Sequence, residues 1–125
     1  MLRAVTIGIL FGTVGFLASS AAWSQGSALP PVPFAVGLGH EGYKSNCAAC
    51  HGQSLQGSPQ GPPLNHGYYH PGHHSDVAFY RAISKGVQQH HWNFGNMPAI
   101  QNVQQKEAEA IVRFIRWAQQ AMGLY

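Results

Sequence analysis

Cysteine is scarce in this sequence, which contains only Cys47 and Cys50. Because a second cysteine pair is missing, a closed structural zinc site with four cysteine ligands is excluded. The chain also lacks a convincing run of alternating apolar and polar residues, so the βαβ context of a thioredoxin-like redox pair is not present. No internal repeat occurs. These absences leave few explanations for two cysteines placed so close together.

Charge is sparse as well, since charged residues make up 9% of the chain. Lys and Arg number seven against four Asp and Glu, which gives a net charge of +3. Without Arg3, which lies in the N-terminal segment, the net charge is +2. Such a small excess does not favour nucleic acid or an anionic membrane surface as a partner.

What the sequence does contain is the run Cys47-Ala48-Ala49-Cys50-His51. Cys-x-x-Cys-His is the pattern through which a haem is attached to c-type proteins. Two thiols three positions apart can add to the two vinyl groups of one porphyrin, and the next histidine is then held under the iron. We therefore predict one covalent haem, attached through Cys47 and Cys50, with His51 as its proximal ligand. A disulfide between the cysteines would leave His51 unexplained.

The N-terminal segment combines Arg3 with an uncharged, largely apolar run over residues 4–22 that ends in small residues. This pattern predicts a secretory signal peptide over residues 1–24, cleaved after Ala22 or Ser24. An uncleaved anchor is the alternative, because a run of about 19 residues approaches the length of a membrane span. We expect membrane association only in that case. Both readings predict export, with the functional domain in the periplasm.

The remaining chain divides into a linker and one domain. Residues 25–36 are rich in proline and predict an extended linker. Residues 37–125 form the domain, which we expect to be a monomer. A chain of about 89 residues has a thin apolar core, and a buried haem would supply much of it.

Three helices are predicted in this domain. A short helix over residues 38–46 leads into the cysteine motif. A second helix over residues 77–85 starts after Ser75-Asp76, places Val77, Tyr80 and Ile83 on one apolar face, and ends at a left-handed Gly86. The third starts near Asn102 or Gln104, and its apolar face is the clearest pattern in the chain: Ala108, Ile111, Val112, Ile115, Ala118 and Met122. Long loops over residues 52–74 and 86–101 connect the helices, so the sequence predicts an all-α domain wrapped around a cofactor.

These motifs, in this order, resemble class I cytochrome c, the family of small monohaem electron-transfer proteins. Gly39 and Tyr43 look like the family's N-terminal helix, and Phe114 falls where the family packs an aromatic residue against that glycine. Residues 76–83 resemble the family's middle helix. The resemblance covers about residues 37–122 and implies the cytochrome c fold, with three to four helices and long loops around one covalently attached haem.

Two loop segments carry the rest of the resemblance. Gly61-Pro62-Pro63-Leu64 is similar to a family segment in which the proline carbonyl accepts a hydrogen bond from the proximal histidine and the leucine packs on the haem. Asn96-Met97-Pro98 resembles the loop that supplies the second axial ligand. Met97 lies in a polar loop where no periodicity explains an apolar residue, which also favours a thioether ligand. The resemblance thus implies the haem contacts Cys47, Cys50, His51, Pro62, Leu64 and Met97, with His51 and Met97 on the iron.

Six of the seven other histidines lie in the two loops: His66, His70, His73, His74, His90 and His91. We expect polar loop residues, some of which donate to haem propionates. Two alternatives stay open. His74, His90 or His91 could replace Met97 on the iron, or the iron site could be open. Three or four of the loop histidines could instead converge on a second metal, copper or zinc.

The predicted function is that of an exported carrier of single electrons between redox partner proteins, and not that of an enzyme. Two alternatives differ in class. The chain could be the haem subunit of a larger membrane or periplasmic oxidoreductase, which an uncleaved anchor would favour. It could also be a histidine-rich haem protein that handles metals or senses ligands.

Overall fold

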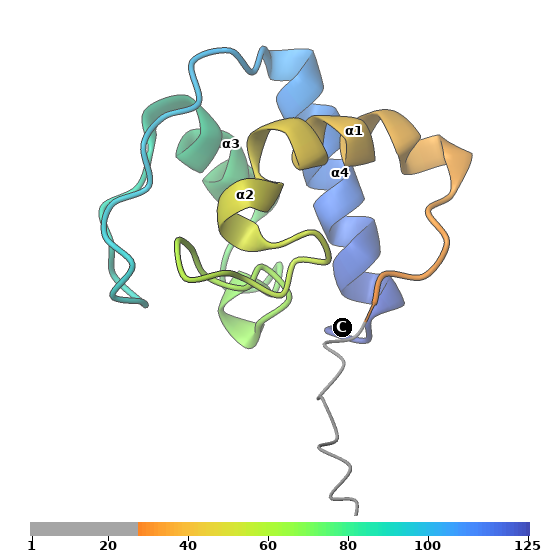
Figure 1. The fold of residues 1–125 in the computed structure, drawn as a ribbon, viewed down its shortest axis with the longest axis horizontal. Helices are drawn as coiled ribbons and strands as arrows, with labels where there is room; N and C mark the ends of the chain where they lie inside the picture. Colours follow the sequence, from red (N-terminus) through yellow and green to blue (C-terminus); the bar gives the residue numbers. More distant parts are fainter. Residues whose placement is uncertain (1–27) are drawn as a thin grey trace, which may run out of the picture.

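The computed structural model describes residues 28–125, and its regular elements are helices (Figure 1). In chain order they are η1 (Phe34–Val36), α1 (Gly37–Asn46), α2 (Ala48–His51), η2 (Gly67–Tyr69), α3 (Asp76–Lys85) and α4 (Gln105–Ala121). Within this range β-pairing is limited to two isolated bridges, Ser58 with Gly61 and Val87 with Met97. The all-α class predicted from the sequence is confirmed.

The N-terminal predictions mostly fall outside this range. The predicted signal peptide, residues 1–24, lies outside the described residues. Among the helices that are described, none has the length and apolar character needed to cross a membrane. The described part of the proline-rich segment contacts the domain, because Leu29, Val32 and Val36 are partly buried against the core.

Helices α1 and α4 pack against each other, and α1 crosses the long α4 in Figure 1. At the crossing, a Cβ added to Gly39 would lie 2.0 Å from the Ala110 carbonyl oxygen and 3.0 Å from the Cβ of Phe114. Only glycine permits this approach, and the predicted contact of Gly39 with Phe114 is confirmed. The Tyr43 ring lies beside that of Phe114, with 5.3 Å between centroids.

The apolar face of α4 supplies much of the core. Ile111, Val112, Ile115 and Ala118 are buried, as their helical spacing predicted, and Phe114 is buried beside them. The helix begins one residue after Gln104, the later of the two predicted starts. Gln119 is also fully buried, which the sequence did not predict for a polar residue.

The apolar face predicted for α3 is wrong in part. Phe79 and Ile83 are the buried residues, whereas Val77 is 58% exposed. The guanidinium of Arg116, from α4, lies over the Phe79 ring, 4.7 Å from its centroid. Gly86 ends the helix with a φ of 74°, as predicted, but its ψ of −177° is extended rather than left-handed helical.

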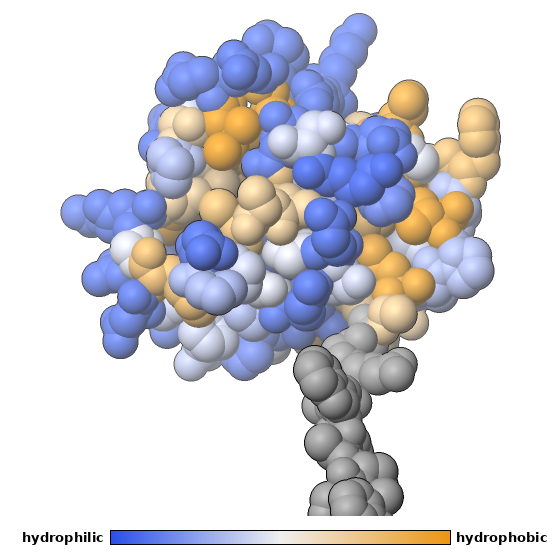
Figure 2. Space-filling view, in the orientation of Figure 1, coloured by the Kyte–Doolittle hydropathy of each residue, from blue (hydrophilic) through white to orange (hydrophobic). Residues whose placement is uncertain are grey.

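The most exposed apolar side chains of the described residues lie at the start of the domain. Phe34 and Leu38 are 102% and 86% exposed. In Figure 2, orange and tan atoms lie on the right of the view, where η1 and the start of α1 lie, and further orange and tan areas lie at the upper left and centre among hydrophilic residues.

Candidate cofactor site

The short helix α2 sets the geometry of the cysteine–histidine motif. The backbone N–H of His51 donates to the Cys47 carbonyl at 2.9 Å, and that of Cys50 donates to the same carbonyl at 3.1 Å. Residues four apart in a helical turn share a face, so Cys47 and His51 both line one cavity. Cys50 is exposed at the rim of the turn. The Tyr43 hydroxyl donates to the Gly52 carbonyl at 2.7 Å and holds the end of α2 against α1.

His51 is buried, and its ring orientation is fixed by one hydrogen bond. Its Nδ1 donates to the Pro62 carbonyl at 2.9 Å, which is the bond that the resemblance implied. Because a carbonyl can only accept, the proton of the neutral ring is on Nδ1 and the lone pair is on Nε2. Burial lowers the pKa of His51. The side chain is therefore neutral near pH 7 and has a nitrogen available for a metal.

The cavity beside His51 has a volume of about 410 Å³. This volume lies within the range typical of cofactor and ligand sites. Pro62, Leu64 and Met97 line it, as do Cys47 and His51. The structure thus brings five of the six predicted site residues to one cavity, and the sixth, Cys50, follows in the same helical turn. Apolar side chains from α3 and α4 form the remaining inner wall: Phe79, Ile83, Ile111 and Ile115.

Met97 is held at the cavity by a pair of backbone hydrogen bonds. Its N–H donates to the Val87 carbonyl, and the Val87 N–H donates back to the Met97 carbonyl, both at 2.9 Å. Gly86 permits this pairing, because a Cβ there would lie 2.5 Å from the Met97 carbonyl oxygen. The two ends of the second loop are thereby clamped, and the methionine side chain is half-buried at the cavity wall.

Two further observations test whether a haem fits these residues. Among the described residues, the buried indole Nε1 of Trp92 has no hydrogen-bond partner, although the ring lines the cavity. A cofactor with a carboxylate at its edge would satisfy that donor. Burial, followed by the charge of Glu107, raises the pKa of Cys47 to about 12. A neutral thiol is a poor zinc ligand or redox nucleophile, whereas a thioether carries no charge and suits a buried wall. The residues fit a haem.

The sequence did not predict the role of two polar residues of α4, Arg116 and Gln119, which hold the loop of residues 52–74 against the helix. The Gln119 amide donates to the Leu64 carbonyl at 2.7 Å and accepts from Arg116 at 2.8 Å. Arg116 also donates to the carbonyls of Tyr69 and His74, at 2.7 and 2.5 Å. One sequence signal could have found Gln119: it lies four residues after Ile115, so it falls on the inward face of the helix. The carbonyls that Arg116 and Gln119 bind could not be predicted, because they belong to a distant loop whose path no local pattern specifies.

The loop histidines separate into two groups. His70 lies edge-on to Tyr125, with 5.3 Å between ring centroids, and His66 packs on Tyr68 and Trp92. The other four loop histidines come together from both loops: His73, His74, His90 and His91. The open side of the cavity is therefore bordered by imidazoles, and three of these four also line it.

Comparison with known proteins agrees with this architecture. The model of one family, described as Cytochrome c, matches residues 36–119. That range includes the cysteine motif, the cavity-lining loops and most of α4. No curated protein matches the chain.

Proposed function

This chain belongs to the cytochrome c family, and from that premise we propose that it is an exported carrier of single electrons with one covalently attached haem. The observation that carries the proposal is the arrangement around His51. Cys47, the neutral buried imidazole oriented by the Pro62 carbonyl, and Met97 line one cavity, and Cys50 follows in the same helical turn as Cys47. Members of the family bind haem covalently and carry electrons.

The roles of the residues follow from that arrangement. Cys47 and Cys50 would form the two thioether bonds, and His51 Nε2 and Met97 Sδ would bind the iron. Pro62 would fix the His51 ring, while Leu64 and the apolar residues of α3 and α4 would exclude water from the cavity. When bound, haem supplies the Fe(III)/Fe(II) couple. A thioether ligand favours a higher reduction potential than a second imidazole would.

Covalent attachment is tested by extracting the purified holoprotein with acid acetone. We expect the haem to stay with the polypeptide. The double variant Cys47→Ala/Cys50→Ala should yield a chain without attached haem that is largely unfolded, because the cavity would lose its main packing partner. Ser45→Ala, a substitution in the exposed part of α1, is the matched control and should retain attached haem. Pigment that passes into the organic phase from the wild-type protein would refute covalent attachment.

The role of Met97 is tested by Met97→Ala. A methionine–Fe(III) bond gives a weak charge-transfer band at the red end of the spectrum, which bis-histidine ligation lacks. We expect the variant to lose this band and to have a lower reduction potential. Met122→Ala, a change at the other methionine near the core, should keep the band. A wild-type band that survives in Met97→Ala would point to another ligand.

Export is tested on the mature protein from the native host. We propose that the signal peptide is removed after Ala22 or Ser24, so the mass of the isolated protein should correspond to a chain starting at residue 23 or 25 plus one covalent haem. Recovery of the full-length chain in the membrane fraction would instead favour an anchor and a role as the haem subunit of a larger oxidoreductase.

A further inference from the structure

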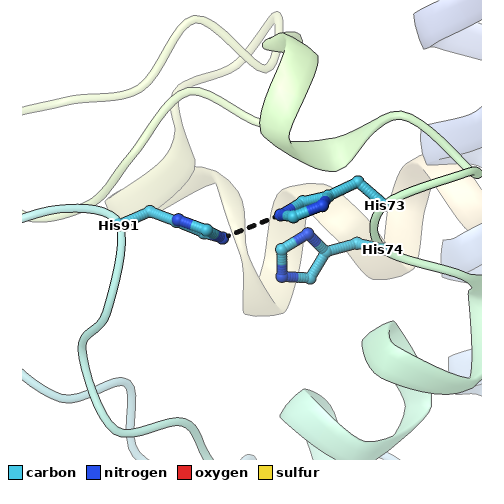
Figure 3. Close-up of side chains that lie close together, drawn as sticks. All are labelled: His73, His74 and His91. Atoms are coloured by element: carbon cyan, nitrogen blue, oxygen red, sulfur yellow. Dashed lines mark hydrogen bonds between the residues drawn. The ribbon is translucent and has the colours of Figure 1, made fainter.

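The four histidines at the open side of the cavity have no role in the proposed electron carrier. Figure 3 shows His91 from the second loop turned toward His73 and His74 from the first. Each of these three offers one ring nitrogen, and the three nitrogens lie within 4.8 Å of one another. The Nε2 atoms of His73 and His91 are 3.2 Å apart. The Nε2 atoms of His74 and His90 are 3.5 Å apart.

These spacings match the edge of a tetrahedral metal site. Zinc binds imidazole nitrogens at about 2.0–2.1 Å, which places two ligands of a tetrahedron about 3.3 Å apart. The 3.2 and 3.5 Å distances lie on either side of that value. The group of His73, His74 and His91 spans up to 4.8 Å, which is wider than this edge. His73 and His90 are exposed, so their side chains can rotate toward a shared ion.

The hydrogen bonds of His74 and His90 turn their Nε2 atoms toward each other. The Nδ1 of His74 donates to the Tyr68 carbonyl at 2.5 Å, and the Nδ1 of His90 donates to the Gln88 carbonyl at 2.9 Å. With Nδ1 engaged in both rings, Nε2 is the nitrogen that each ring can offer to a metal ion. Imidazoles that ligate metals are oriented by bonds of this kind to backbone carbonyls.

Aromatic stacking and backbone contacts hold the ligand side chains in place. The Tyr68 ring stacks on His91, with 4.3 Å between centroids and an angle of 18° between the planes. Arg116 fixes the carbonyl of His74 from α4 and so anchors the first-loop half of the cluster.

We propose that His73, His74 and His91, with His90 as the fourth ligand, form a zinc site at the edge of the cofactor cavity. The sequence alone favoured scattered loop histidines, because it could not show that the two loops meet. The site uses none of the residues assigned to the haem. It joins the two loops through one ion, and a dication there lies beside the cavity that His74, His90 and His91 line. The positive charge should stabilise the reduced iron relative to the oxidised iron.

The test is calorimetric titration of holoprotein with zinc, on a protein made without a polyhistidine tag and with its haem content checked by absorption. We expect one zinc per chain and more than about 100-fold weaker binding in His73→Ala/His91→Ala, because two direct ligands are lost. His70→Ala, from the same loop but packed on Tyr125, is the matched control and should bind like wild type. His90→Ala should weaken binding without abolishing it.

Several results would overturn the proposal. The first two are the absence of saturable zinc binding and equal zinc affinity in wild type and the double variant. The third is a haem spectrum that changes in the double variant, which would make His91 an iron ligand. Saturating zinc should also raise the reduction potential of wild type but not of the double variant. A potential that does not respond would place the ion elsewhere. Covalent haem attachment is measured separately, so failure of the zinc site and failure of the electron-carrier proposal are distinguishable.

Discussion

The two loops that enclose the cavity are held in different ways. The first loop, residues 52–74, is anchored from outside by α4, where Gln119 binds the Leu64 carbonyl and Arg116 binds those of Tyr69 and His74. In the second loop, residues 86–101, most hydrogen bonds join residues of the loop itself. Val87 pairs with Met97, the Gln89 N–H donates to Asn96, and the Gln89 side chain accepts from Gly95.

The first loop is therefore fixed by the helices, whereas the second loop depends mainly on its own hydrogen bonds. The first loop presents Pro62 to the buried His51, so the proximal side of the site is fixed by the helical scaffold. The second loop presents Met97 from a clamped hairpin that meets the scaffold near its end, where the Ile100 N–H donates to the Ile83 carbonyl at 2.8 Å. We therefore expect changes in α4 to affect stability most, and changes in the second loop to affect the methionine side of the site.

The largest effect is expected from Arg116→Ala, which removes the anchor of the first loop. The variant leaves the His74 carbonyl without this donor, leaves the Tyr69 carbonyl only the 3.4 Å bond from Gln119, and removes the ion pair with Asp76. It should lower the free energy of unfolding by about 2–4 kcal/mol. Chemical denaturation of the holoprotein measures the loss. Arg116→Lys should recover only part of it, because one ammonium cannot replace a guanidinium that spans several acceptors.

Arg113→Ala is the control, since Arg113 is exposed on the same helix. We expect a change within about 0.5 kcal/mol for this variant. The methionine-dependent band should persist in Arg116→Ala if the two loops are held independently. Loss of that band would show that the second loop relies on the first.

A smaller effect is expected from Gly39→Ala, which acts where α1 crosses α4. The new methyl group would meet the Ala110 carbonyl and Phe114, so the helices must separate. Overpacking of this kind costs about 1–3 kcal/mol. Gly37→Ala, in the same helix but with open space around the added Cβ, is the control, and similar denaturation midpoints for the two variants would contradict the close approach.

Gly86→Ala should disturb the second loop specifically. The residue has a φ of 74°, and its added methyl would lie 2.5 Å from the Met97 carbonyl oxygen. We expect about 1–2 kcal/mol of destabilisation from the strained backbone, together with a weaker methionine-dependent band. Gly95→Ala is the control, because Gly95 also has a positive φ but has open space around an added Cβ. This variant should lose stability and keep the methionine-dependent band unchanged.

The smallest effect is expected from Asn96→Ala, which removes an exposed hydrogen bond to the Gln89 N–H. Net stability should fall by no more than about 1 kcal/mol. Thermal unfolding of the holoprotein measures this change. A loss as large as that of Arg116→Ala would mean that the second loop is not the less anchored of the two.

Much of the fold followed from the sequence because its signals are local. The periodicity of residues 108–122 gave α4. The crossing of Gly39 with Phe114 is not local, and it was expected only because the resemblance to class I cytochrome c implied it. The face of α3 was misassigned because Val77 and Phe79 are both apolar, and only tertiary contacts of Phe79, with Tyr69 and Arg116 among them, distinguish the residue that turns inward. The turn of helix at residues 48–51 was too short to be predicted by periodicity.

For the site, the sequence by itself determined which residues we propose to carry the chemistry, through the spacing of Cys47, Cys50 and His51 and the unexplained Met97 in a polar loop. Only the tertiary structure decided what surrounds them. The Gln119 and Arg116 anchors and the meeting of His73 and His74 with His90 and His91 join residues 16 or more positions apart. Such contacts depend on how the helices pack and where the loops reverse, and neither leaves a pattern in neighbouring residues.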